Sequence, residues 1–170
     1  MPDVVEKVKE ERSLSEKILS YIPGYSGYKE KELRRETDKL VRDQAVMKLK
    51  DAKVALNESI REIADSGNTS AFQYANRSIA ALDRVTSKIK YADYGYSGFF
   101  DAVKVKEDKL DKLIEFDLTL LNVADYVKES ASNVTGQPDM DKAFNDFRKK
   151  LVQLETDFNN RENIIFAVSK

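Results

Sequence analysis

The 170-residue chain contains no cysteine and no histidine. This excludes disulfides, zinc sites built on thiolates, and nucleophiles activated by a histidine base. Glycine and proline are scarce, with 6 and 3 residues, which suits long uninterrupted helices. No apolar run approaches the roughly 18 residues of a membrane span. Residues 1–11 mix valine with charged residues, unlike a signal peptide, so we expect a cytoplasmic protein.

Charge is abundant but balanced. Charged residues make up 35% of the chain, with 29 basic and 30 acidic side chains and a net charge of -1. A high content of both signs is typical of helices with solvated outer faces. The balance leaves no overall positive field to hold a phosphate backbone, so we expect no nucleic-acid partner.

A short phrase occurs twice in the sequence. Gly-Tyr-Ser-Gly spans residues 24–27, followed by Tyr28, and recurs at residues 95–98, followed by Phe99. Glycines at both ends permit positive φ angles, so each copy is predicted to form a tight turn that fixes an aromatic residue. Outside these five positions the two surroundings match poorly, which favours similar turn chemistry over an internal repeat.

Apolar residues recur with helical spacing along most of the chain. They predict an N-terminal amphipathic helix over residues 3–22, long helices over residues 29–65, 70–91 and 102–130, and a last helix that begins near Pro138. Thr69 or Ser70 is the expected N-cap of the second long helix. Short connections favour an all-α fold, an antiparallel up-down four-helix bundle preceded by the short helix. The expected domains are residues 1–22 and residues 23–170.

The last helix has the clearest pattern. Its apolar residues alternate steps of four and three, the spacing of a coiled-coil seam. Only Arg161 interrupts this seam, and we expect its side chain to extend into solvent. Asp117 lies near the inner stripe of the preceding helix and is the best candidate for a buried acid, held by an ion pair or a backbone bond. An antiparallel pairing would place Arg161 level with Asp108 and Asp111 instead.

In this topology both glycine-bracketed turns lie at the same end of the bundle. Their tyrosines could cap that end with satisfied hydroxyls, or could form a recognition surface with nearby arginines. The second interpretation predicts a protein partner or self-association. Its partner-binding residues are Tyr25, Tyr28, Arg34, Arg35, Tyr94, Tyr96 and Phe99.

Residues 1–22 suggest an alternative function, association with a membrane surface. An amphipathic helix can pack on the bundle, contact a partner, or lie on a membrane surface. Its charged face mixes both signs, whereas membrane-surface helices are usually rich in lysine and arginine, so packing or partner contact is the preferred interpretation.

The first turn with its charged continuation, residues 22–36, and the second turn with residues 94–101 resemble a group of small prokaryotic helical proteins. That group has no known activity, so the resemblance assigns no residue a role. No phosphate-binding glycine loop is present, and helical di-iron sites require histidine. We therefore expect a non-enzymatic interaction or scaffold protein with no cofactor and no metal. An enzyme built on carboxylates is the third hypothesis, and it would need a bound metal.

Overall fold

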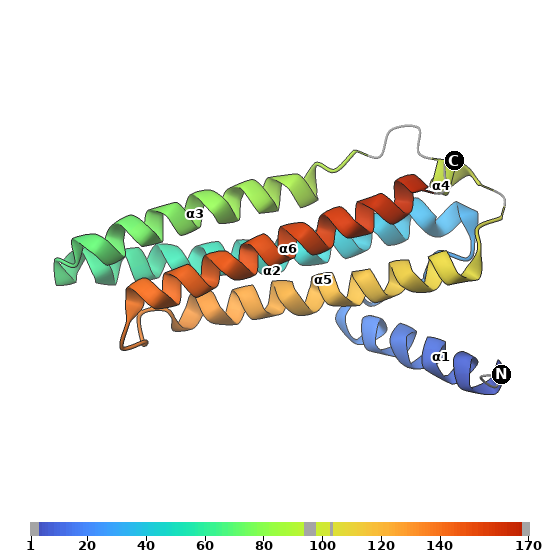
Figure 1. The fold of residues 1–170 in the computed structure, drawn as a ribbon, viewed down its shortest axis with the longest axis horizontal. Coiled ribbons are helices and arrows are strands. Elements are labelled where there is room, and N and C mark those ends of the chain that lie inside the picture. Colours follow the sequence, from blue (N-terminus) through green and yellow to red (C-terminus); the bar gives the residue numbers. More distant parts are fainter. Residues whose placement is uncertain (1–3, 94–97, 103, 168–170) are drawn as a thin grey trace. The chain divides into compact units, whose positions relative to one another are not determined.

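The structure, a computed structural model, describes residues 4–93, 98–102 and 104–167, with side chains from Ser13 onward. These residues form helices and connections, and no β-strand is found among them. The all-α class is therefore confirmed. Figure 1 labels the main elements. In chain order the elements are α1 (Val4–Tyr21), the 3₁₀ helix η1 (Lys31–Leu33, not labelled in the figure), α2 (Arg34–Ser66), α3 (Thr69–Lys90), α4 (Gly98–Asp101), α5 (Glu107–Asn133) and α6 (Met140–Ala167).

The chain divides into two compact units. Unit 1 comprises Met1–Gln44, Asp93–Leu121 and Asp157–Lys170, and unit 2 comprises Ala45–Ala92 and Asn122–Thr156. Helices α2, α5 and α6 each contribute to both units. The boundary that we expected after residue 22 stays a prediction.

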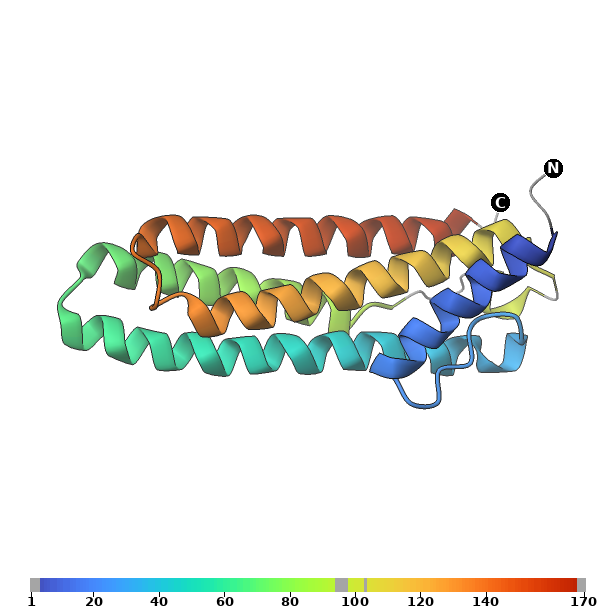
Figure 2. The same cartoon turned by 90° about the horizontal axis from the view of Figure 1, so that it is seen from below.

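In unit 2, ion pairs fix the directions of neighbouring helices. Lys48 of α2 pairs with Asp125 of α5, and Asp51 pairs with Lys128 at 2.9 Å. Because the residue numbers rise together, α2 and α5 run in the same direction where they meet, as Figure 2 also shows.

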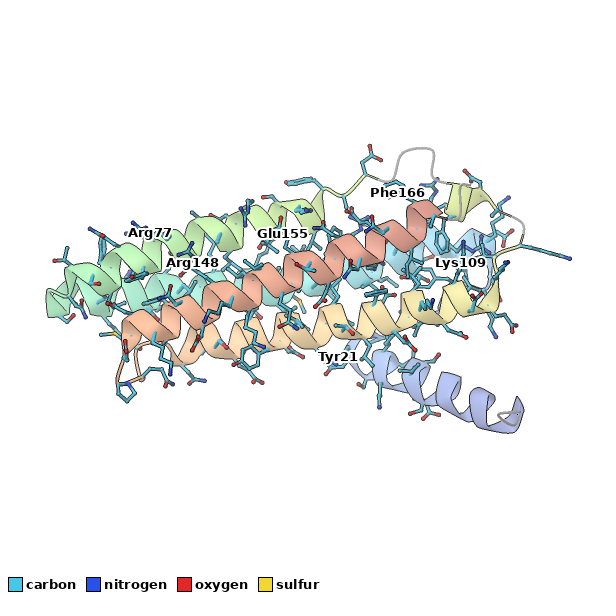
Figure 3. The ribbon with its side chains drawn as sticks, viewed as in Figure 1. Tyr21, Arg77, Lys109, Arg148, Glu155 and Phe166 are labelled. Carbon is cyan, nitrogen blue, oxygen red and sulfur yellow. The ribbon has the colours of Figure 1, made fainter. Side chains whose placement is uncertain are left out.

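Helices α3 and α6 are also parallel in unit 2. Ser70 Oγ donates to Asp141 Oδ2 at 2.8 Å, and Arg84 pairs with Glu155 (labelled in Figure 3) at 3.2 Å. Helices α2 and α3 are antiparallel, since Lys53 pairs with Asp83 at 2.8 Å across the turn that joins them.

The turn between α2 and α3 corrects one local prediction. Gly67 has φ +73°, the left-handed conformation expected of the residue after a helix. The N-cap of α3 is Asn68 rather than Thr69 or Ser70, because the Asn68 side chain accepts a hydrogen bond from the Ala71 amide at 3.1 Å.

The helix predicted over residues 102–130 begins later and ends later than expected. The structure has the short helix α4 before it, and α5 starts at Glu107 and continues to Asn133. Residues 102–106 read Ala-Val-Lys-Val-Lys, and the β-branched valines reduce helix propensity there. Phe72, in the first turn of α3, is 38% exposed although it is apolar.

The core of unit 1 forms where α1, α4 and the ends of three long helices meet. Figures 1 and 2 show α1 lying obliquely across the first part of α5. Ile18 and Ile22 are buried there, at 0% and 3% exposure. Other buried apolar side chains of unit 1 are Val41, Phe99, Phe100, Leu110, Leu113, Leu120, Leu121, Phe158 and Ile165.

Every helix among the described residues is too short or too polar to cross a lipid bilayer.

Candidate functional site: a buried tyrosine–aspartate–arginine cluster

Asp117 lies at the centre of a buried polar cluster in unit 1. The hydroxyl of Tyr28 donates to Asp117 Oδ2 at 2.5 Å, and the hydroxyl of Tyr25 donates to the same oxygen at 3.3 Å. Arg161 Nε donates to Asp117 Oδ1 at 2.6 Å. Asp117 is 0% exposed. Both carboxylate oxygens therefore have partners, as a buried acid requires.

Arg161 joins three parts of the chain. Besides Asp117 of α5, its guanidinium lies 2.7 Å from Asp38 Oδ1 of α2 and donates to the Tyr28 hydroxyl at 3.0 Å. The side chain is 0% exposed. Two expectations were therefore wrong: Arg161 does not extend into solvent, and its partner is Asp117 instead of a residue near Asp108 or Asp111. Such a buried guanidinium is stable only where acceptors surround it.

The charges of the cluster balance. Asp38 also accepts from Arg42 Nε at 3.0 Å, so two carboxylates face two guanidiniums. Burial raises the pKa of Asp117 above its ordinary value, while the Arg161 charge and the hydrogen bonds from Tyr28 and Arg161 oppose that rise. Burial also raises the pKa values of Tyr25 and Tyr28, with the Asp117 charge adding to the effect. Both phenols therefore remain protonated donors at neutral pH.

Two glycines shape the segment that brings the tyrosines to Asp117. We call residues 22–30, between α1 and η1, the tyrosine strap. Gly24 and Gly27 have φ angles of +89° and +68°, which a residue with a Cβ atom resists. The rings of Tyr25 and Tyr28 meet edge to face, with centroids 6.3 Å apart. The turn lies earlier than the predicted residues 24–27, since the Tyr25 amide donates to the Ile22 carbonyl at 3.2 Å, and the two tyrosine side chains point into unit 1.

The trailing aromatic residues of the two copies touch. The ring centroids of Tyr28 and Phe99 lie 5.8 Å apart in an edge-to-face arrangement, and Phe99 is 0% exposed. The expectation that the two copies converge is confirmed for these residues. Residues 94–97 lie outside the described part of the chain.

Arg34 joins the strap to α4 through backbone carbonyls. Its Nε donates to the Tyr28 carbonyl at 2.8 Å, and its Nη1 donates to the carbonyls of Phe99 and Ala102 at 2.9 and 2.7 Å. The side chain is 1% exposed. Each of these bonds has a charged donor, and such bonds are stronger than neutral ones.

The neighbouring Arg35 faces outward. Its guanidinium lies 4.6 Å from the centroid of the Phe100 ring and 3.9 Å from Asp101 Oδ2. The Arg35 and Asp101 side chains are 57% and 71% exposed. The two consecutive arginines therefore differ: Arg34 binds buried backbone of unit 1, while Arg35 presents a charge at a surface corner beside the exposed Asp101, over the buried Phe100 ring.

Comparison with protein families, curated proteins and solved structures gives no match to this chain. Its function is therefore argued from the geometry of its own residues.

Most of the residues that we expected to bind a partner are buried. Tyr25, Tyr28, Arg34 and Phe99 are at most 7% exposed and take part in the internal cluster or its surroundings. Tyr25 and Tyr28 have the satisfied hydroxyls that the capping alternative expected, because both donate to Asp117. These four side chains do not form an exposed surface: the two tyrosines contact Asp117, Arg34 contacts backbone carbonyls, and the Phe99 ring packs against Tyr28. Tyr94 and Tyr96 lie outside the described residues.

Asp38 and Arg42 are members of the cluster that the sequence analysis did not select. Both are charged residues, a class that is rarely buried in proteins. A signal was present nevertheless, because the buried stripe of α2 through Ala45 and Val41 reaches Asp38 at the same helical spacing. Asp38 is 2% exposed.

Tyr28, Asp117 and Arg161 are buried and bonded to one another. Two grooves of unit 2, one lined by residues of α5 and α6 and one by residues of α2 and α3, contain no member of the cluster. Among the described residues, no group of three or more acidic side chains is arranged to hold a metal ion. The cluster can fix the strap against α2, α5 and α6 by hydrogen bonds and charge pairs.

Proposed function

We propose that this chain is a helical interaction or scaffold protein that acts without catalysis. It recognises a protein partner, or a second copy of itself, through a surface corner formed by the exposed side chains of Arg35 and Asp101 over the buried Phe100 ring. The observation that carries the proposal is the contrast between Arg34 and Arg35. The Arg34 side chain is buried and donates to backbone carbonyls. The Arg35 side chain is exposed, with its guanidinium over the Phe100 ring.

An exposed arginine that is already oriented is well suited to recognition. The Phe100 ring restricts the Arg35 side chain, so less conformational entropy is lost when a partner binds. Arginine presents a planar fork of donors that matches a carboxylate, and it is among the residue types that dominate binding energy at interfaces. The weak contact with Asp101 at 3.9 Å can be exchanged for a closer carboxylate of a partner.

The arrangement of the long helices supports a scaffold role. We propose an up-down four-helix bundle, in which α2 and α5 run one way and α3 and α6 the other. The ion pairs of unit 2 support these directions. In unit 1 the buried cluster fixes the strap that leads into α2, and so holds Arg35 in place. A cytoplasmic location is part of the same proposal, and cell fractionation tests it.

The membrane alternative for residues 1–22 has less support. Ile18 and Ile22 are buried in the core of unit 1, so this part of the apolar face is already occupied. Flotation of the full chain with anionic and neutral vesicles tests it directly. Binding that disappears when residues 1–21 are removed would favour the membrane function over the interaction function.

The proposed function is tested by comparing the wild-type chain with Arg35→Glu in affinity capture and in solution mass measurements. We expect a captured protein, or a dimer at high concentration, that is lost with Arg35→Glu. Lys39→Glu is the matched control, because it makes the same charge change at an exposed position of α2. Identical capture and identical molar mass for all three chains would contradict a role for the corner.

A further inference from the structure

One face of α2 in unit 2 carries apolar side chains that remain exposed. Met47 is 51% exposed and Val54 is 59% exposed. They are seven residues, or about two turns, apart, so they lie on the same side of the helix. Lys53, which pairs with α3, and Asp51, which pairs with α5, lie on either side of this face. The face is therefore the side of α2 that is turned away from both neighbouring helices.

The charged residues of this face are arranged about Val54. Lys50 lies four residues before Val54 and Glu58 lies four residues after it, and both side chains are exposed. Lys50 has no acidic residue three or four positions away on α2, where a helix neighbour would meet it. A positive and a negative charge thus lie at equal distances from an apolar centre. We use the name Val54 face for the set Met47, Lys50, Val54, Glu58 and Arg61.

Such a surface is complementary to itself when it is turned around. In a two-fold dimer the same patch of both copies meets, so residue i faces residue j while j faces i. With the axis at Val54 and the two helices antiparallel, Lys50 of each copy faces Glu58 of the other, and the valines pack together. Met47 then faces the exposed Arg61 of the second copy, whose aliphatic stem can cover it.

Other alignments of the two helices lose these contacts. A parallel pairing in register sets Lys50 against Lys50 and Glu58 against Glu58, and like charges that meet at an interface are destabilising. An antiparallel pairing shifted by one turn sets Val54 against a charged residue, either Lys50 or Glu58. The charge pattern therefore favours one orientation and one position of the axis.

We propose that the Val54 face binds the same face of a second copy of this chain, in an antiparallel homodimer with its two-fold axis at Val54. The face covers about four turns of one helix. This is a small surface, and interfaces below about 1,200 Å² are typical of weak or transient complexes. The dimer should therefore form at high protein concentration and weaken as salt screens its exposed ion pairs.

Sedimentation equilibrium of the full-length chain, from micromolar to millimolar concentration, tests the dimer. We expect the apparent molar mass to rise from that of the monomer toward twice that value. Lys50→Glu or Glu58→Lys alone should weaken the dimer by about tenfold or more, because each sets like charges together at two places. Val54→Asp should also weaken it, since two carboxylates would meet at the axis. All three positions are exposed, and circular dichroism checks that each variant keeps its helices.

Mixing the two charge variants identifies the pairing. In an equimolar mixture of the Lys50→Glu chain and the Glu58→Lys chain, both attractive pairs across the axis are restored. The mixture should therefore form a heterodimer as readily as the wild type dimerises. Positions 50 and 58 are about 12 Å apart along one helix, so this recovery reports contact between two chains.

Lys142→Glu and Glu129→Lys are the matched controls, with the same charge changes at exposed positions of α6 and α5 in unit 2. Both should dimerise as the wild type does. A wild-type chain that stays monomeric at millimolar concentration would overturn the proposal, as would a mixture that associates no better than the single variants.

The Arg35 corner belongs to unit 1, so the two tests can be told apart. Arg35→Glu should leave the Val54 dimer intact. A dimer that is lost with Arg35→Glu and kept in the Val54-face variants would overturn this proposal and support the corner.

Discussion

Tyr28 and Arg161, which are 133 positions apart in the sequence, share a hydrogen bond of 3.0 Å inside unit 1. The same tyrosine hydroxyl donates to Asp117, which Arg161 also contacts. One phenol thus acts as acceptor for a guanidinium and donor for a carboxylate. This triangle ties the strap to α5 and α6.

Replacing Arg161 by methionine should be severely destabilising. Asp117 and Asp38 would lose a buried counter-charge, and breaking a buried ion pair costs about 3–5 kcal/mol. Urea unfolding followed by circular dichroism measures the change. The double variant Asp117→Leu with Arg161→Met should recover part of the loss, because it removes both charges of one pair. Additive effects of the two substitutions would show that the pair is not coupled.

Phenylalanine substitutions separate the two tyrosines of the strap. Tyr28→Phe should lower the free energy of unfolding by roughly 1.5–3 kcal/mol, since it loses a hydrogen bond to a charged group. Tyr25→Phe should cost less, because its bond to Asp117 is longer, at 3.3 Å compared with 2.5 Å. Tyr126→Phe serves as the control at a half-exposed position in unit 2. The opposite ranking of Tyr25 and Tyr28 would contradict the geometry.

The adjacent arginines provide a matched pair of variants. Arg34→Met should cost at least about 3 kcal/mol, because it removes three hydrogen bonds from a charged donor to buried carbonyls. Arg35→Met should change stability by less than about 1 kcal/mol, since its ion pair is exposed. Thermal and urea unfolding of both variants measure these values. If Arg34→Met cost as little as Arg35→Met, the three hydrogen bonds of Arg34 would not be important for stability.

Alkaline titration tests the burial of the strap. Because the folded pKa values of Tyr25 and Tyr28 are raised, their contribution to stability is fully present below pH about 10, the pKa of a free tyrosine. It is lost as the pH rises toward the folded values. Absorbance of tyrosinate should therefore show two of the 8 tyrosines ionising only as the chain unfolds. In Tyr25→Phe with Tyr28→Phe, this late step should disappear.

Asp157 offers a stabilising substitution. Its Oδ2 is buried without a hydrogen-bond partner, and burial raises the pKa of its carboxyl. A raised carboxyl pKa means that stability is lost as the pH rises through the folded value. Asp157→Asn should therefore raise the free energy of unfolding at pH 7, and the gain should shrink at pH 3. A loss of stability at pH 7 would indicate a partner for the ionised form.

The sequence predicted the helical stripes well because burial repeats with the helix period. In α6, Phe144, Phe147 and Leu151 are buried as expected, and so are the seam positions of α5 on either side of Asp117. The same spacing could have identified Arg161 as buried, since it occupies a seam position. The general preference of arginine for solvent led to the opposite expectation.

The partners of these polar residues could not be predicted in the same way. Periodicity shows which face of a helix is buried, but it does not show how far one helix is shifted along another. Arg161 was therefore assigned to the level of Asp108 and Asp111, two turns away from Asp117. The strap presented a similar difficulty, because the inward direction of Tyr25 and Tyr28 depends on the φ angles of two glycines.

The buried guanidinium of Arg161 also limits where α6 can slide. An apolar seam repeats every seven residues, so leucine and phenylalanine alone would tolerate a slip of the helix along its groove. A slip of one turn, about 5.4 Å, would leave a positive charge among apolar side chains with its acceptors out of reach. We infer that Arg161, a charged residue in an otherwise apolar stripe, selects one alignment of α6 with its neighbouring helices. Alignments shifted by one turn are excluded.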